Sequence, residues 1–393
     1  MDISRFRRSL SDVALKYKSH LSFFVVMVSA LIAVVSRVVD REEGGRWVFW
    51  KKSYLPDGYN YILEAININS WGNYELMLGK LEKLFPGSSA LMGEQSIAVT
   101  NTLDARPIYP LVTSFFLDLN FEIAPLVAPV FSWLLLNILV YHNIRRIHGA
   151  AYALIVVIIF SSSFYMRFNF IGTTTDALSA LFTYLVFHYL MQENLSLVRN
   201  LLINLFLLLA VLTRPLDPIF LVLLIGVALL NARNWKIVSR LILPISMLIS
   251  HLIYIQLKYQ QLQVGSVNTG GDRDASYLQY LIEAALKVPK LIIVEFGFIA
   301  VNDSIFFLLI LWALILLWFK RDKFLTLQFA LVFFSTFYLA ALNGPIGNGF
   351  RYQIPIVMFC LIVFRISDSP SKVWKRVRNY HLNEKSEDSF SLR

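Results

Sequence analysis

The chain has 393 residues, of which 57% are hydrophobic and 16% charged, and its formal net charge is +10. Ordinary globular domains carry about 25% charged residues, so this composition excludes a typical soluble domain. Apolar stretches of roughly 20 residues recur along the chain, and each is long enough to cross a bilayer core. The sequence therefore predicts an all-α polytopic integral membrane protein in contact with the lipid bilayer. No soluble basic domain is present, which argues against a nucleic-acid partner.

The first apolar stretch runs from about Leu21 to Val38 and follows a basic segment. It is longer than the apolar part of a signal peptide, and Arg41, Glu42 and Glu43 stand where a small-residue cleavage site would be. We interpret this stretch as a retained signal anchor whose N-terminus is cytoplasmic.

Further apolar stretches bring the expected number of spans to about ten. They run approximately from Pro125 to Ile144, Ala150 to Phe164, Thr173 to Met191, Leu201 to Leu212, Pro218 to Leu230, Leu241 to Lys258, Ser304 to Phe319, Phe324 to Leu342 and Tyr352 to Phe364. Two shorter stretches, Pro107 to Leu119 and Leu291 to Val301, either dip into the membrane or extend a neighbouring span.

Basic residues set the expected orientation, because cytoplasmic loops carry an excess of Lys and Arg. Alternation from a cytoplasmic N-terminus puts the basic clusters inside: Arg145-Arg146, Arg233 with Lys236 and Arg240, Lys320-Arg321-Lys323, and Lys372 to Arg378. Both termini are then cytoplasmic. A short single-domain chain with a basic signal anchor suits a multi-pass protein of a bacterial inner membrane.

We expect one transmembrane domain over residues 1–366, followed by a basic, polar cytoplasmic tail over residues 367–393. Two long extracytoplasmic loops interrupt it, at about 39–106 and 259–290. In the first loop, Pro56-Asp57-Gly58 breaks the chain, and the spacing of apolar residues after Tyr59 and after Met77 predicts two amphipathic helices. In the second loop, the same spacing predicts a surface helix from Tyr277 to Val288.

Ionisable residues recur at the expected outer ends of the spans, where each one is costly and needs a reason. They are Arg106, Arg167, Asp176, Arg214, Asp217 and Arg351, the last followed by Tyr352. Arginine suits phosphate oxygens, so these residues could form a cationic cradle for the headgroup of a polyprenyl phosphate. The alternative is structural: each Arg extends to the interface, or pairs with Asp176 or Asp217 between helices.

Asp57 is the candidate catalytic residue in the first outer loop. Transfer of a sugar passes through an oxocarbenium-like transition state, and a carboxylate can deprotonate the incoming hydroxyl group. The structural alternative is that Asp57 caps the helix that begins beside it.

The sequence indicates no particular cofactor, and it is compatible with a divalent metal. Glu64, Asp104, Asp272, Asp274 and Asp303 are expected outside, where they either help to hold a metal ion or acceptor, or are simply solvated. His142, His148, His188 and His251 show no zinc-binding spacing. The single cysteine, Cys360, excludes a disulfide framework and is expected to be a small core residue.

The arrangement resembles the GT-C superfamily of membrane glycosyltransferases, which have one span followed by a large outer loop with an early acidic residue. The stretches that carry the resemblance are Pro56-Asp57-Gly58-Tyr59, Arg106-Pro107-Ile108-Tyr109-Pro110, Gly172-Thr173-Thr174-Thr175-Asp176, Thr213-Arg214-Pro215 and Gly349-Phe350-Arg351-Tyr352. The resemblance implies a polyprenyl-phosphate sugar as donor, inversion at the anomeric carbon, and Asp57 as general base. Many members have two adjacent acids at this position, whereas this chain has Asp57-Gly58, which leaves a metal in doubt.

The sequence thus favours an inverting hexosyl- or pentosyltransferase that modifies a glycan, lipid or protein acceptor at the extracytoplasmic face. The main alternative is a transporter or lipid-glycan flippase, which would have polar residues near the midplane and inverted repeats. A glycan polymerase or ligase, and a purely structural assembly protein, rank below these two.

Overall fold

The computed structural model describes residues 3–41, 47–49, 56–69, 74–85, 106–190, 196–214, 277–320, 322–343 and 353–366. The regular secondary structure of these residues is helical apart from one hairpin, in which β1 (Val39–Arg41) pairs antiparallel with β2 (Trp47–Phe49). The predicted helical class is confirmed for this part of the chain. The hairpin follows directly on the first helix, and the sequence analysis did not predict it.

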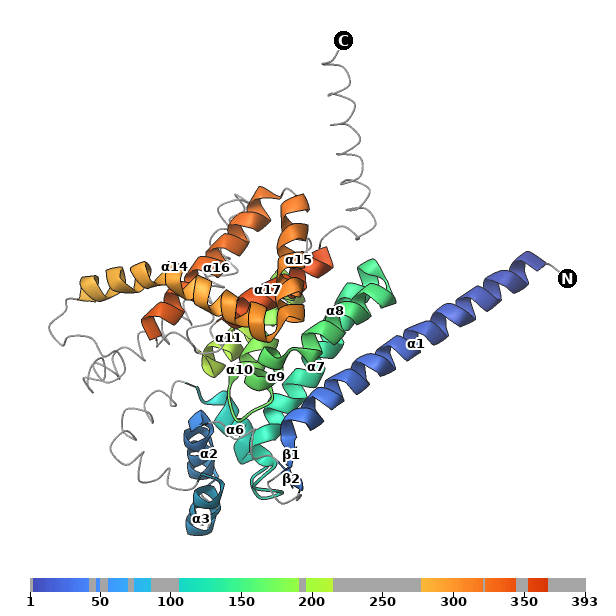
Figure 1. Ribbon diagram of the computed structural model, residues 1–393. Helices are drawn as coiled ribbons and strands as arrows, with labels where there is room; N and C mark the ends of the chain where they lie inside the picture. Colours follow the sequence, from blue (N-terminus) through green and yellow to red (C-terminus); the bar gives the residue numbers. More distant parts are fainter. Residues whose placement is uncertain are drawn as a thin grey trace.

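Helices occupy all the predicted spans that fall within the described residues (Figure 1). The helices of the described residues, including those of the outer loops, are α1 (Ile3–Val38), α2 (Pro56–Ile68), α3 (Tyr74–Leu84), α6 (Ile108–Ser114), α7 (Ala124–His148), α8 (Ala150–Ser162), α9 (Phe164–Phe170), α10 (Asp176–Leu190), α11 (Leu197–Thr213), α14 (Tyr277–Asn302), α15 (Ser304–Lys320), α16 (Lys323–Asn343) and α17 (Ile354–Ile366). The spans predicted at Pro218 to Leu230 and Leu241 to Lys258, and the tail over residues 367–393, lie outside the described residues.

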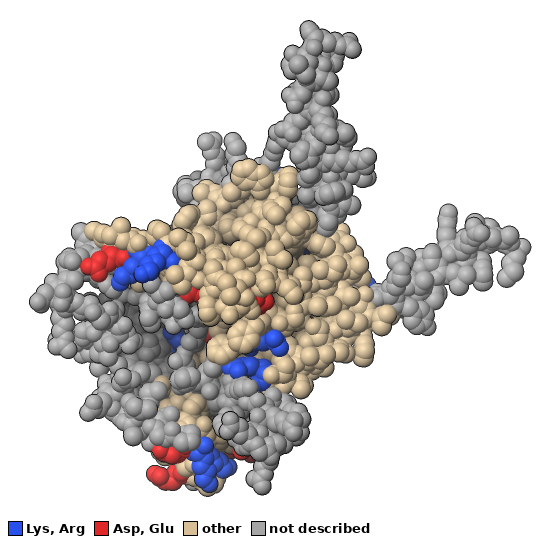
Figure 2. All heavy atoms as spheres, viewed as in Figure 1, with Lys and Arg blue, Asp and Glu red and all other residues tan. Residues whose placement is uncertain are grey.

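Two helices have the length and apolar character of a membrane span, within the ranges given above: His20–Val38 of α1 and Ala124–His148 of α7. The bent pair α8 and α9 passes the same test when it is counted as one span, and α11, α15, part of α16 and α17 are shorter apolar helices. Figure 2 shows a broad uncharged surface over the bundle, with charged side chains near α3 and the beginning of α14, and a smaller group of Lys or Arg atoms near the centre of the view. The chain therefore has the character of a helical membrane protein.

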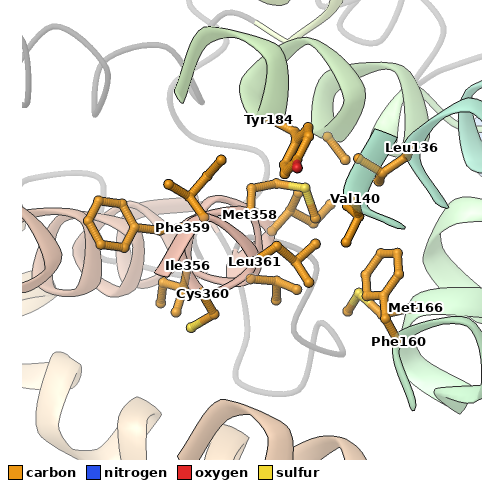
Figure 3. Close-up of a cluster of buried hydrophobic side chains, with 14 of the residues drawn as sticks. Leu136, Val140, Phe160, Met166, Tyr184, Ile356, Met358, Phe359, Cys360 and Leu361 are labelled. Atoms are coloured by element: carbon orange, nitrogen blue, oxygen red, sulfur yellow. The ribbon is translucent and has the colours of Figure 1, made fainter. Parts of the chain in front are cut away.

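The centre of the bundle is α17, which is buried except for its last two residues. Every residue from Ile354 to Phe364 is buried, and the helix packs against α7, α10, α15 and α16. Figure 3 shows Met358 and Leu361 of α17 among Val140 of α7 and Tyr184 of α10. A helix that is apolar on all sides is stable only where other helices surround it, so the sequence of α17 explains its central place. Cys360 is buried here, as predicted.

Helix α14 joins two segments that the sequence analysis had separated. The predicted surface helix beginning at Tyr277 and the apolar stretch ending near Val301 form one continuous helix with Pro289 inside it. A proline inside a helix removes a hydrogen bond and costs about 3 kcal/mol, which packing of the flanking turns can offset. Leu291 and Ile299 are buried after the proline, where α14 packs against α15 and α16.

The predicted span from Ala150 to Phe164 ends in a sharp bend of 65° between α8 and α9. Ser163 makes the bend: its side chain accepts a hydrogen bond from Met166 N (3.2 Å), which caps α9. The Ser163 hydroxyl also donates to Asp303 Oδ2 (2.7 Å), between α14 and α15. Asp303 accepts from Tyr165 N as well (3.4 Å), so this acid links two bends of the chain. Asp303 therefore has a structural role, whereas the sequence analysis had considered only metal or acceptor binding and solvation for it.

The basic ends of several helices meet at one end of the bundle. His148 of α7 lies 3.3 Å from the Arg365 carbonyl of α17, and Lys320 of α15 donates to the Ile366 carbonyl (3.1 Å). Arg365 contacts His188 of α10 through both Nδ1 (2.9 Å) and the carbonyl (3.1 Å). The C-terminal ends of these four helices therefore lie together, where cations are favoured by the free carbonyls and the helix dipoles. Since α7 and α10 run in the same direction, both begin at the opposite end of the bundle.

Candidate functional site

Helix α2 lies at that opposite end, beside α3 and α6 (Figure 1). It begins at Pro56, a position where the missing amide hydrogen of proline costs nothing. Asp57 is thus the second residue of α2, slightly inside the helix start at which the sequence had placed it; the structure does not describe its side chain. Tyr59, Ile62 and Ile66 of α2 are buried against Leu81 of α3, so the two predicted amphipathic helices of the first outer loop pack on each other.

The next residue of α2, Gly58, is buried and makes the closest approach in this region. A Cβ atom at position 58 would lie 1.9 Å from Thr173 Oγ1, 2.5 Å from Thr173 Cβ and 3.1 Å from the Thr173 carbonyl oxygen. Only glycine leaves room for these atoms, so the packing of α2 on Thr173 requires the residue that follows Asp57 to have no side chain. A second acid at this position would not fit.

Thr173 belongs to a buried segment, Thr173–Asp176, that leads into α10. Thr174 donates to the Asn169 carbonyl (3.2 Å), and all four residues are buried. The Thr175 hydroxyl is buried and has no hydrogen-bond partner among the described residues. Asp176 is the first residue of α10, where a carboxylate is favoured by the helix dipole. The segment therefore connects the surface that Gly58 contacts with an ionised side chain.

Asp176 forms an ion pair with Arg214, the residue that follows α11. Arg214 Nη1 lies 2.6 Å from Asp176 Oδ1, and the two side chains are 6% and 1% exposed. Breaking such a pair leaves a buried charge uncompensated, which costs about 3–5 kcal/mol. The pairing that the sequence analysis considered as a structural alternative is present. It also fixes the guanidinium of Arg214 at the beginning of α10.

Arg106 reaches the same end of the bundle from the segment before α6. Its Nη1 donates to the Tyr61 hydroxyl of α2 (2.8 Å). Tyr61 packs edge-on against Tyr109 (5.2 Å between ring centroids), and the Tyr109 hydroxyl donates to the Pro125 carbonyl at the start of α7 (2.6 Å). Because Tyr61 is one helical turn after Asp57, Arg106 is held against the first two turns of α2.

Arg167 makes its contacts elsewhere. Its Nη1 donates to Ser36 Oγ of α1 (2.8 Å), and its Nε donates to the Ser163 carbonyl (3.3 Å). The structure thus joins Arg106 to α2 and Arg214 to α10, but it joins Arg167 to the end of α1.

Three more candidate site residues, Asp217, Arg351 and Tyr352, lie outside the described residues. No group of three or more His, Cys, Asp or Glu residues that could hold a metal ion occurs in the described part of the chain. Glu64, another candidate acid, is half-buried on α2 and accepts a hydrogen bond from Asn67 (3.5 Å).

Burial in the α2–α3 cluster raises the pKa of the Tyr59 phenol, and the nearby Glu82 carboxylate adds to the shift. Tyr59 therefore stays protonated at neutral pH and is no candidate base.

The sequence analysis missed two roles, those of Gly58 and Tyr61. Gly58 had been noted only as the absence of a second acid, and a close approach of two helices cannot be seen in a sequence. Tyr61 carried a weak signal, because it follows Asp57 by one helical turn in a loop expected to hold a site. Arg106 is thus joined to α2 and Arg214 to the beginning of α10, and the contact of Gly58 with Thr173 links these two helix starts.

Comparison of the chain with family models, with curated proteins and with solved structures finds no match.

Proposed function

We propose that the chain is an inverting glycosyltransferase of the GT-C type, with a polyprenyl-phosphate sugar as donor. The observation that carries the proposal is the contact between Gly58 and Thr173. It joins the helix start that carries Asp57 to the segment that ends in the Asp176–Arg214 ion pair. An acid and a fixed guanidinium are thereby connected through a chain of buried contacts.

In the proposed reaction, the Asp57 carboxylate takes the proton of an acceptor hydroxyl group as its oxygen attacks the anomeric carbon. The bond between that carbon and the phosphate oxygen breaks, and polyprenyl phosphate leaves with both bonding electrons. Attack opposite to the leaving group inverts the anomeric configuration. The acceptor is a glycan, lipid or protein, and the transferred sugar is a hexose or a pentose.

Arg106, Arg214 and Arg351 are proposed to contact the leaving phosphate, whose negative charge increases as the bond breaks. Tyr61 orients Arg106 through their hydrogen bond (2.8 Å), and Asp176 orients Arg214 through the ion pair (2.6 Å). Asp217 and Tyr352 complete the proposed phosphate-binding set. The proposal assigns no divalent metal to the site. The carboxylates of the described residues do not gather into a ligand set.

We propose that the end of the bundle at which α2 and the beginning of α10 lie faces the outside of a bacterial inner membrane. We also propose that about ten spans cross this membrane. The support is the charge distribution, because the basic ends of α7, α10, α15 and α17 meet at the opposite end. Basic segments remain preferentially cytoplasmic, so both termini are then cytoplasmic.

The proposal is tested by incubating the purified full chain with a panel of isotopically labelled polyprenyl-phosphate sugars and hydroxyl acceptors. We expect one donor to yield a covalent product whose anomeric configuration, read by NMR, is opposite to that of the donor. Retention of configuration, or movement of intact lipid-linked sugar across a vesicle membrane without a covalent product, would contradict it. The second result would favour a flippase.

A further inference from the structure

A groove of about 270 Å³ runs between α1 and α8. Only 22% of the apolar span of α1 is buried, so its remaining surface faces hydrocarbon in a bilayer. Apolar side chains, among them Val25, Val28 and Ile158, form most of the groove wall. The groove is therefore continuous with the surface of α1 that contacts lipid.

The hydroxyl groups in the groove are all used within the protein. Ser29 and Ser161 share a hydrogen bond (2.6 Å) that joins α1 to α8. Ser161 also donates to the Ile158 carbonyl (3.2 Å), and Ser162 donates to the Ile159 carbonyl (3.1 Å). Because the serine hydroxyl groups already form hydrogen bonds within the protein, the groove offers a ligand a mainly apolar wall.

One end of the groove is cationic. Arg167 lines it, is half-buried, and uses Nη1 and Nε for Ser36 and the Ser163 carbonyl. A guanidinium has five N–H donors, and Arg167 Nη2 has no hydrogen-bond partner among the described residues. Nor is a carboxylate paired with Arg167 there. A second guanidinium, that of Arg37, lies 4.6 Å from the ring centroid of Phe168, the residue after Arg167.

We propose that this groove binds an anionic bilayer phospholipid, with an acyl chain between α1 and α8 and the phosphodiester at Arg167. An apolar wall that ends in a guanidinium with donors to spare matches such a lipid in both shape and charge. An apolar helix from a second copy would supply no counter-charge for Arg167. The site rests on membrane insertion of α1 and α8 and is independent of glycosyl transfer.

The test uses the purified full chain in phosphatidylcholine vesicles that contain a trace of phosphatidylglycerol with a photoreactive acyl chain. The comparison probe is diacylglycerol with the same acyl chain, which lacks the phosphate. We expect labelling of residues 25–33 and 158–162 to be about tenfold stronger with phosphatidylglycerol. Arg167→Gln should reduce labelling to the diacylglycerol level, whereas Arg167→Lys should keep most of it.

A matched pair of groove variants decides the result independently of Arg167. Ser162→Phe fills the groove from an exposed position on α8, whereas Val35→Phe places the same aromatic side chain at an exposed position of α1 that does not line it. We expect Ser162→Phe to abolish the labelling and Val35→Phe to leave it unchanged. Equal labelling by the two lipids, persistence of the label in Ser162→Phe, or cross-links between two copies in place of lipid labelling would overturn the proposal.

Discussion

Gly58 illustrates at the scale of one residue how backbone packing brings the candidate site together. The Thr173 side chain occupies the place where any other residue would have its Cβ atom. The helix carrying Asp57 can approach the beginning of α10 only because this atom is missing.

Gly58→Ala should therefore displace α2 from Thr173 and reduce both stability and the rate of transfer. Overpacking of a tight contact costs about 1–3 kcal/mol, and a displaced base loses its alignment with the acceptor. Thermal unfolding of the detergent-solubilised chain and an activity assay measure the two effects. Gly79→Ala is the matched control, since a Cβ atom there meets nothing within 4 Å, and it should leave both quantities unchanged or slightly raise stability.

A second residue-scale prediction concerns the buried pair of Asp176 and Arg214. Asp176→Asn should destabilise the chain by about 3–5 kcal/mol, because the buried guanidinium loses its counter-charge. The double variant Asp176→Leu with Arg214→Met should recover much of that loss yet stay inactive, because both charges are gone. Full activity in the stable double variant would show that Arg214 does not contact the phosphate.

At the scale of elements, the bend between α8 and α9 depends on one side-chain linkage. Ser163 caps α9 and donates to Asp303, so Ser163→Ala and Asp303→Ala should each cost about 0.5–2 kcal/mol. Because the two variants remove the same hydrogen bond, their combined effect should be smaller than the sum of the single effects. A double-mutant cycle of thermal unfolding measures this, with exposed Ser162→Ala as the control expected to change little. Additive losses would mean that the linkage is not cooperative.

Helix positions were the part of the fold that the sequence predicted well, because apolar length and spacing are local properties. The stretch from Tyr352 to Phe364 was correctly expected to be a helix, but its central place became visible only when α7 and α10 packed around it. The continuity of α14 was missed because Pro289 and a change of polarity suggest a boundary that tertiary packing overrides.

The candidate site was predictable only in part, for a related reason. Charged residues are rare in this apolar chain, and their rarity indicated Arg106, Asp176 and Arg214 as site residues. These three residues lie at one end of the bundle. The same signal included Arg167, which instead binds Ser36 of α1 and the Ser163 carbonyl. Which helix each arginine contacts depends on how the helices pack, and that information is not local.

At the scale of the whole molecule, the two ends of the bundle should face opposite sides of the membrane. Cys360 is buried, so single cysteines placed elsewhere report their own accessibility to an impermeant maleimide. Glu75→Cys on exposed α3 should react from outside, whereas Ile147→Cys at the basic end of α7 should react only after the membrane is opened. The reverse pattern would contradict the proposed orientation.

The most direct test of the central claim is the rate of sugar transfer by Asp57→Asn with the donor that the wild type uses. A general base contributes about 10²–10⁴-fold, so we predict a loss of at least about 100-fold in kcat with little change in donor affinity. Glu75→Gln, a neutralised acid on exposed α3, should keep the wild-type rate. Transfer by Asp57→Asn within a few-fold of the wild type would remove Asp57 from the mechanism.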